Sequence, residues 1–288
     1  MSRLLVVIAP VLALNLTLGS QTACGAPERL TASQEEVLAL REVSGLARGR
    51  VGGAEVLLAI GDEARAVTVI PIVKDLPDVA AARSVAVALP VVKGGSQLEG
   101  VAIDARGHVW LLSEGEAPSL TEVVLDGDSA SVVQRGELVV PAGHPLEIAW
   151  ARDANARGEG LVVQEGRVLI AKQKDPTAIV AFTPSGDHWV AGTYWTVVAL
   201  DDLSDLAVGP DGAIFAIGAR SERICRLAPL TPGGGEVRCE QHWTLPATLG
   251  NGSPHWEGLA FMDDGRPVVA VDRKKSDSPN FALLPLLK

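Results

Sequence analysis

The sequence lacks the short motifs that mark common enzyme classes. It has no Gly-x-Ser-x-Gly nucleophile elbow, no zinc-ligand spacing of histidine and cysteine, no P-loop and no dinucleotide fingerprint. It also lacks an excess of positive charge, because 25 basic side chains stand against 35 acidic ones, a formal net charge of −10. This balance disfavours nucleic acid as a partner. It favours a cation, or a small polar or anionic ligand held by a locally basic pocket.

Helical periodicity and domain linkers are also missing from residues 35–288. The chain has 288 residues, 47% of them hydrophobic, which is ample for a core. We therefore expect one all-β domain over residues 35–288.

A long apolar run occurs only at the N-terminus. Arg3 precedes apolar residues 4–18, and small and polar residues fill 19–26, which is the layout of a secretory signal peptide over residues 1–26. The run is shorter than the roughly 20 residues that a spanning helix needs. We expect an exported protein, located in the periplasm, at the cell surface or outside the cell.

The sequence has few cysteines, three in all. Cys225 and Cys239 flank a Pro-Gly-Gly-Gly turn symmetrically, which predicts a cross-strand disulfide in an oxidising compartment, with two buried free thiols as the alternative. Cys24 follows the apolar run where bacterial lipoproteins carry their acylated cysteine. Gln21 departs from that pattern, so cleavage near Ala26, without lipid anchoring of the chain to a membrane, stays open.

What the sequence does contain is a repeat. Five segments share an apolar motif at intervals of 45 to 60 residues, and all but the first lead through a short glycine turn into a second apolar strand. The five segments are Ser44-Gly-Leu-Ala47, Glu99-Gly-Val-Ala102, Glu159-Gly-Leu-Val162, Ser204-Asp-Leu-Ala207 and Glu257-Gly-Leu-Ala260. The spacing suits one four-stranded propeller blade per copy.

The repeat predicts a five-bladed β-propeller of four-stranded blades. The fifth copy has only three strands before the chain ends, so we expect residues 37–41 to supply the missing outer strand and close the ring. A six-bladed ring is the alternative if residues 142–157, interpreted as a loop, hide further strands.

The residue before each Gly-Leu pair varies and lies where a propeller's inner strands meet the central channel. Glu99, Glu159 and Glu257 would converge there with Ser44 and Ser204. Packing does not call for glutamates at these positions, and their mutual repulsion would be costly unless a cation or basic side chains offset it. We predict a metal site, with Ca²⁺ as the ion that suits several carboxylates. The alternative is that each glutamate caps backbone groups or faces water.

The ends of the second strands carry a further set of charged side chains of both signs. They are Asp62, Glu63, Glu114, Lys172, Lys174, Arg220, Asp272 and Arg273. This mixture could hold an anionic ligand beside a metal, as phosphoester chemistry requires, or form an ordinary solvated rim. His255, two residues before Glu257, is a candidate acid or base, with a structural role as the alternative.

The motifs also resemble two known families. Val43-Ser-Gly-Leu-Ala47, Leu98-Glu-Gly-Val-Ala102 and Ala171-Lys-Gln-Lys-Asp-Pro176 resemble the SdiA-regulated family of exported bacterial propellers. Trp256-Glu-Gly-Leu-Ala260, followed by Asn280-Phe281, is similar to the C-terminal part of esterase-like phytase propellers. Gln173 replaces an acidic residue of the first family, and residues 278–281 alter the ending of the second.

These resemblances imply an exported propeller, calcium binding for the first family and phosphoester hydrolysis for the second. We therefore expect a metal or small polar ligand at the axial mouth, without an assigned reaction. A metal-assisted phosphoesterase using Lys172, Lys174 or Arg273 to hold phosphate is the second hypothesis. A scaffold that recruits envelope proteins is the third, and it is favoured if the axial carboxylates lie far apart.

Overall fold

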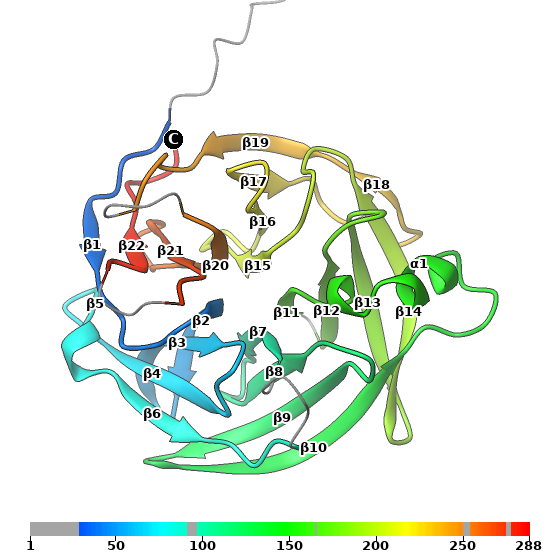
Figure 1. Cartoon of the computed structure of the whole chain (residues 1–288), viewed down its shortest axis with the longest axis horizontal. Coiled ribbons are helices and arrows are strands. Elements are labelled where there is room, and N and C mark those ends of the chain that lie inside the picture. The colour runs from blue at the N-terminus through cyan, green and yellow to red at the C-terminus, as the bar shows by residue number, and fades with distance from the viewer. Residues whose placement is uncertain (1–28, 91–96, 165, 250–253, 275–277) are drawn as a thin grey trace, which may run out of the picture.

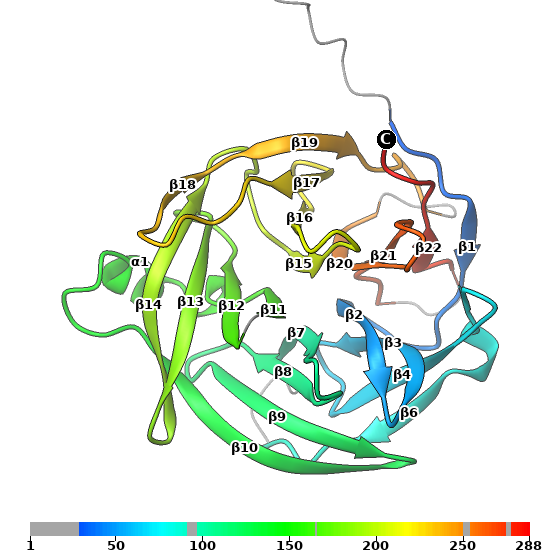
Figure 2. The same cartoon turned by 180° about the vertical axis from the view of Figure 1, so that it is seen from behind.

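The computed structural model describes residues 29–90, 97–164, 166–249, 254–274 and 278–288 (Figure 1). The predicted signal peptide and Cys24 lie outside these residues. Almost all regular structure is β-strand, arranged as sheets around a central axis, with β2, β7, β11, β15 and β20 nearest the centre in both views (Figures 1 and 2). The predicted all-β propeller fold is confirmed.

Within the described residues, the antiparallel pairings group into five four-stranded units, and a short parallel pairing between the outermost strands of two units joins them into one larger sheet. The innermost strands are β2 (Val43–Val51), β7 (Leu98–Ile103), β11 (Gly160–Gln164), β15 (Asp205–Val208) and β20 (Trp256–Phe261). The second strands are β3 (Ala54–Gly61), β8 (Val109–Ser113), β12 (Arg167–Lys172), β16 (Ile214–Gly218) and β21 (Pro267–Val271). The third strands are β4 (Ala66–Val73), β9 (Ser119–Asp126), β13 (Ala178–Ser185), β17 (Arg223–Leu227) and β22 (Phe281–Leu283). The outermost strands are β6 (Arg83–Ala86), β10 (Ser129–Val139), β14 (His188–Val197), β19 (Cys239–Thr244) and β1 (Gln34–Glu36).

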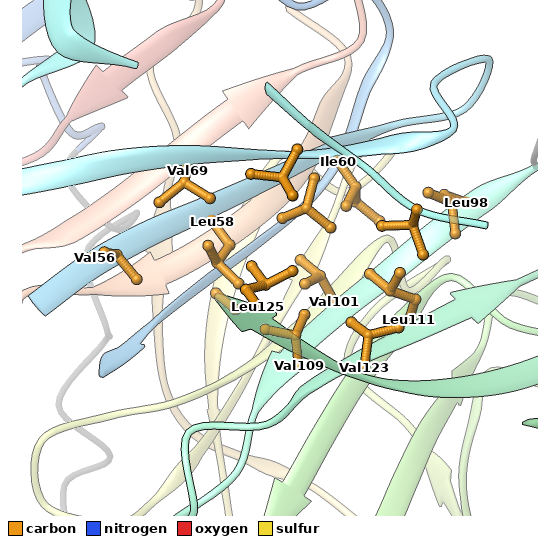
Figure 3. Close-up of a cluster of buried hydrophobic side chains, with 14 of the residues drawn as sticks. Val56, Leu58, Ile60, Val69, Leu98, Val101, Val109, Leu111, Val123 and Leu125 are labelled. Atoms are coloured by element: carbon orange, nitrogen blue, oxygen red, sulfur yellow. The ribbon is translucent and has the colours of Figure 1, made fainter. Parts of the chain in front are cut away.

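The second strands show why the sequence reads as apolar runs. Alternate side chains of a strand point to opposite faces, and both faces of each unit are covered by a neighbour. Leu58 and Ile60 of β3 pack toward the second unit, in the cluster of Figure 3, whereas Leu57 and Ala59 pack toward the fifth. Each such fully buried leucine contributes roughly 2 kcal/mol through removal from water.

The N-terminal strand completes the fifth unit, but it lies earlier than predicted. β1 pairs antiparallel with β22, from Gln34 opposite Leu283 to Glu36 opposite Phe281. The expected strand over residues 37–41 is wrong because the Asn280 side chain takes its backbone groups: the Leu38 N–H donates to Asn280 Oδ1 at 2.7 Å, and Asn280 Nδ2 donates to the Leu38 carbonyl at 3.0 Å.

Residues 142–157 form no strand. They contain α1 (Glu147–Arg152) and a 3-10 turn, η2 (Ala154–Ala156). The expectation that residues 35–288 contain no helix is therefore wrong, because α1 is a short α-helix. The other short elements are β5 (Leu76–Pro77), β18 (Gly235–Val237) and the 3-10 turn η1 (Val79–Ala81). No helix among the described residues is long and apolar enough to cross a membrane.

The predicted disulfide is present. Cys225 on β17 and Cys239 on β19 are bonded, with Cα atoms 5.4 Å apart. The symmetric turn predicts that the two cysteines lie directly opposite each other, and this is wrong. Cys239 pairs with Leu227, because the register of the two strands shifts after Arg226. β18 also interrupts the connection and pairs with β14.

Candidate functional site

A cavity of about 190 Å³ lies at the start of the innermost strands. Six of its eight lining residues carry a carboxyl group, and none is basic. The lining residues are Glu42, Val43, Ser44, Asp62, Glu99, Glu159, Glu257 and Asp272. The structure therefore brings together the three glutamates that the repeat singled out.

Close packing of the inner strands explains this placement. Glu159 immediately precedes β11, and a Cβ added at the next residue, Gly160, would lie 2.6 Å from the Leu206 backbone nitrogen. Only glycine lets the two strands approach so closely. Each Glu-Gly pair thus combines a residue needed for packing with a carboxylate that packing does not need.

The two serine copies diverge. Ser44 lines the cavity, and its hydroxyl donates to the Leu98 carbonyl. Ser204 lies outside the lining and accepts a hydrogen bond from the Ala219 N–H at 3.1 Å. The lining therefore draws on four of the five units, and only the unit of β15 contributes no residue to it.

The carboxylates are held in an environment that disfavours their charge. Glu159 is 6% exposed, and burial, followed by repulsion from Glu114 and Glu99, raises its pKa well above the usual range. Burial and the Glu114 charge likewise raise the pKa of Glu99. No hydrogen bond joins either side chain to another described residue, and the one basic group that offsets the shift of the Glu159 pKa is Lys174.

Two aspartates from the second strands complete the acidic wall. Asp62 and Asp272 follow β3 and β21, and burial raises the pKa of both. Asp272 Oδ1 is buried and has no hydrogen-bond partner among the described residues. An acceptor in this state costs about 1–3 kcal/mol unless a cation or water contacts it.

His255 lies at the rim, with its side chain 60% exposed. Its Nδ1 is 2.5 Å from Glu257 Oε1, and this hydrogen bond is the main reason that the pKa of His255 is raised. A second basic contact to a lining glutamate is made by Lys274, whose Nζ lies 3.6 Å from Glu42 Oε1. The use of His255 as an acid or base stays a prediction.

Glu114 lies beside the cavity and positions the chain that enters β11. Its Oε1 accepts hydrogen bonds from the Arg157 N–H at 2.8 Å and the Gly158 N–H at 3.5 Å. Burial raises the pKa of Glu114 to about 7. The residue directly before Glu159 is thereby tied to the neighbouring unit.

The predicted basic residues lie outside the lining. Lys172 is buried and its Nζ donates to the Lys174 carbonyl, whereas Lys174 Nζ pairs with Asp153 at 3.3 Å. Arg273 donates to the Leu249 carbonyl. Glu63 is exposed and also outside the lining.

Sequence reasoning missed two acidic residues at the axis. Glu42 lines the cavity and precedes the first motif by two residues, with no pattern to mark it. Asp205 is fully buried and occupies the motif position that is glycine in the other four copies. That replacement was visible in the sequence and was the available signal.

A second acidic cluster lies at the other end of β7. Atoms of Asp104, His108 and Glu122 lie within 4.8 Å of one another, which is compatible with a metal ion. Arg106 already occupies this place, since its Nη2 lies 2.6 Å from both Asp104 Oδ2 and Glu122 Oε1. Of the described residues, this trio alone is so compact, so three oxygens of the axial carboxylates do not lie within 4.8 Å of one another.

The fold is shared with solved structures. The chain is similar to the PQQ-bound aldose sugar dehydrogenase of Streptomyces coelicolor, at 13% identity and a TM-score of 0.51 over 90% of this chain and 99% of that one. It is also similar to a putative oxidoreductase (glucose dehydrogenase) of Thermus thermophilus, at 13% identity and a TM-score of 0.50 over 90% and 100%.

A third similar structure is a protein of unknown function from Bacteroides caccae, at 12% identity and a TM-score of 0.50, covering 84% of this chain and 77% of that one. No protein-family model and no curated protein matches the sequence. At these identities the likeness extends to the fold alone: the chain folds as a β-propeller.

Proposed function

We propose that this protein binds a divalent cation, with calcium the first candidate, in the cavity at its axial mouth. The observation that carries the proposal is the six carboxylates around about 190 Å³ with no basic side chain in the lining. Like charges at this density raise one another's pKa unless a cation neutralises them. A hard divalent ion supplies that neutralisation through oxygen ligands.

The residues present fit such an ion. Glu99, Glu159 and Glu257 would hold it together with water, because three of their oxygens do not lie within 4.8 Å of one another. Asp272 Oδ1 adds a buried acceptor that lacks a partner among the described residues. When bound, the ion would supply positive charge to polarise a ligand oxygen at the mouth.

The other hypotheses have less support. A phosphoesterase needs cationic groups beside the metal, and Lys172, Lys174 and Arg273 are engaged elsewhere. A pure scaffold was favoured only if the axial carboxylates lay far apart, and they line one cavity. The activities in the titles of similar structures belong to those proteins. Export and membership of the SdiA-regulated family remain our predictions from the sequence.

Thermal melting tests the proposal. Calcium should raise the melting temperature of the purified chain relative to chelator, because a ligand that binds only the folded state stabilises it. Glu159→Gln should abolish the increase. Glu137→Gln, an exposed residue of β10, is the matched control and should keep it.

Turnover of a phosphomonoester, measured under the same two conditions, separates binding from hydrolysis. Calcium-dependent melting without turnover supports a binding protein. Equal melting with calcium and with chelator would sink the cation site.

A further inference from the structure

The axis contains a second cavity beyond the acidic one. It has a volume of about 260 Å³. Its lining begins at the third residue of each repeated motif, one position after the glycine: Leu46, Val101, Leu161, Leu206 and Leu259. The lining of the acidic cavity ends at the first residue of the motif, one position before the glycine, in four of the five copies. The level between them lines neither cavity and consists of Gly45, Gly100, Gly160, Asp205 and Gly258. Four glycines and one aspartate therefore separate the two spaces.

Asp205 is the single side chain at this level, and it reaches across the axis. It is 0% exposed. Its Oδ2 accepts hydrogen bonds from the Leu259 N–H of β20 at 2.8 Å and from the Leu46 N–H of β2 at 3.4 Å. Its Oδ1 accepts from the Leu206 N–H of its own strand at 2.7 Å. One carboxylate thus joins the innermost strands of three units.

The fourth inner strand packs directly on the same residue. A Cβ at Gly160 of β11 would lie 2.7 Å from the Asp205 Cα. A larger residue at either position would force β11 and β15 apart. The combination of one aspartate with glycines fills the axis without widening it.

We propose that Asp205 closes the axis between the two cavities and is a positioning residue for the cation site, which it makes accessible from one end only. This inference rests on the proposed function for its second part. Leu259 is two residues after Glu257, and Leu46 is two residues after Ser44, so the bonds to Asp205 fix where both lining residues stand. The second cavity is then a separate space, without access to the carboxylates.

Asp205→Gly restores the residue that the other four copies carry. It removes the acceptor for the Leu259 and Leu46 N–H groups and joins the two cavities into one passage. Asp205→Asn keeps the shape but leaves one acceptor oxygen in place of two. Asp128→Asn, whose side chain is 90% exposed in the native chain, is the control.

Hydrogen exchange reads the closure without any metal. In Asp205→Gly, exchange of the Leu259 amide should rise at least about tenfold relative to amides of the outer strands, because the variant removes the side-chain acceptor of this buried N–H. Asp205→Asn should show a smaller rise in exchange of the Leu259 amide. This variant tests the closure if Asp205→Gly does not fold. Unchanged exchange at Leu259 in the variant that folds overturns the closure.

Terbium luminescence reads the positioning role. Tb³⁺ serves as the probe for the acidic cavity, and its decay in H₂O and D₂O gives the number of bound waters. We expect Asp205→Gly to add at least one bound water and weaken Tb³⁺ binding about tenfold, a loss of about 1.4 kcal/mol. Equal hydration and affinity in native chain and variant refute the positioning role. Absence of Tb³⁺ binding by the native chain refutes the proposed function instead, while hydrogen exchange still tests the closure.

Discussion

In the absence of divalent cations, the free energy of unfolding should fall as the pH rises from 5 to 8. Glu114 illustrates the size of the effect, because its pKa is raised from 4.5 to about 7 in the folded chain. The folded state therefore binds more protons than the unfolded state between these two values, and stability falls as the pH rises through that window. A displacement of this size corresponds to roughly 3 kcal/mol once ionisation is complete.

Glu99 and Glu159 act in the same direction, since the pKa of each is raised well above its usual range by burial and like charge. Their ionisation should continue to lower the free energy of unfolding at pH values above the pKa of Glu114. Calcium at about 100 times its Kd would return about 2.7 kcal/mol. The cation should therefore matter most at high pH and least near pH 5.

Urea unfolding followed by tryptophan fluorescence at pH 5, 6, 7 and 8, with chelator present, measures the slope. Glu114→Gln should flatten the profile between about pH 4.5 and 7, because it removes the group that titrates in this window and the strongest repulsion acting on Glu99 and Glu159. A stability that is constant or rises with pH in chelator would refute the reasoning that burial and repulsion govern these carboxylates.

Three further changes test separate parts of the account. Glu159→Gln should stabilise the metal-free chain at pH 8, seen as a higher urea midpoint than in the Glu137→Gln control; a lower midpoint would contradict burial of a charged group. Cys225→Ser should cost about 3 kcal/mol in urea unfolding, since the disulfide spans 14 residues, and an unchanged midpoint would argue against it. Asn280→Ala should cost about 2 kcal/mol and expose the chain near Leu38 to limited proteolysis, whereas full protection would show that the side-chain bonds do not hold this segment.

The inner strands could be predicted because their chemistry repeats. A Gly followed by an apolar residue is needed wherever one inner strand packs on the next. The same short pattern therefore occurs in four of the five copies. The glutamates stood out because packing does not require them. The disulfide could be predicted from the cysteine spacing together with the predicted export, whereas the register of the two strands that it joins could not.

Other features depend on contacts between distant parts of the chain. The closing strand β1 is set by pairing with β22 and by Asn280, more than 240 residues away, which no local pattern reports. Asp205 could be seen to break the glycine pattern, but its bonds to two other units follow from the ring geometry alone. Glu42 joins the site through its place in space, not through a motif.

Calorimetric titration of calcium into the chelator-stripped chain at pH 7 tests the central claim most directly. Two buffers of different ionisation enthalpy would report protons released from carboxyl groups with raised pKa. The account predicts saturable binding with proton release, lost when Glu99, Glu159 and Glu257 are all changed to Gln. No binding heat in either buffer, or the same affinity in that triple variant, would contradict it.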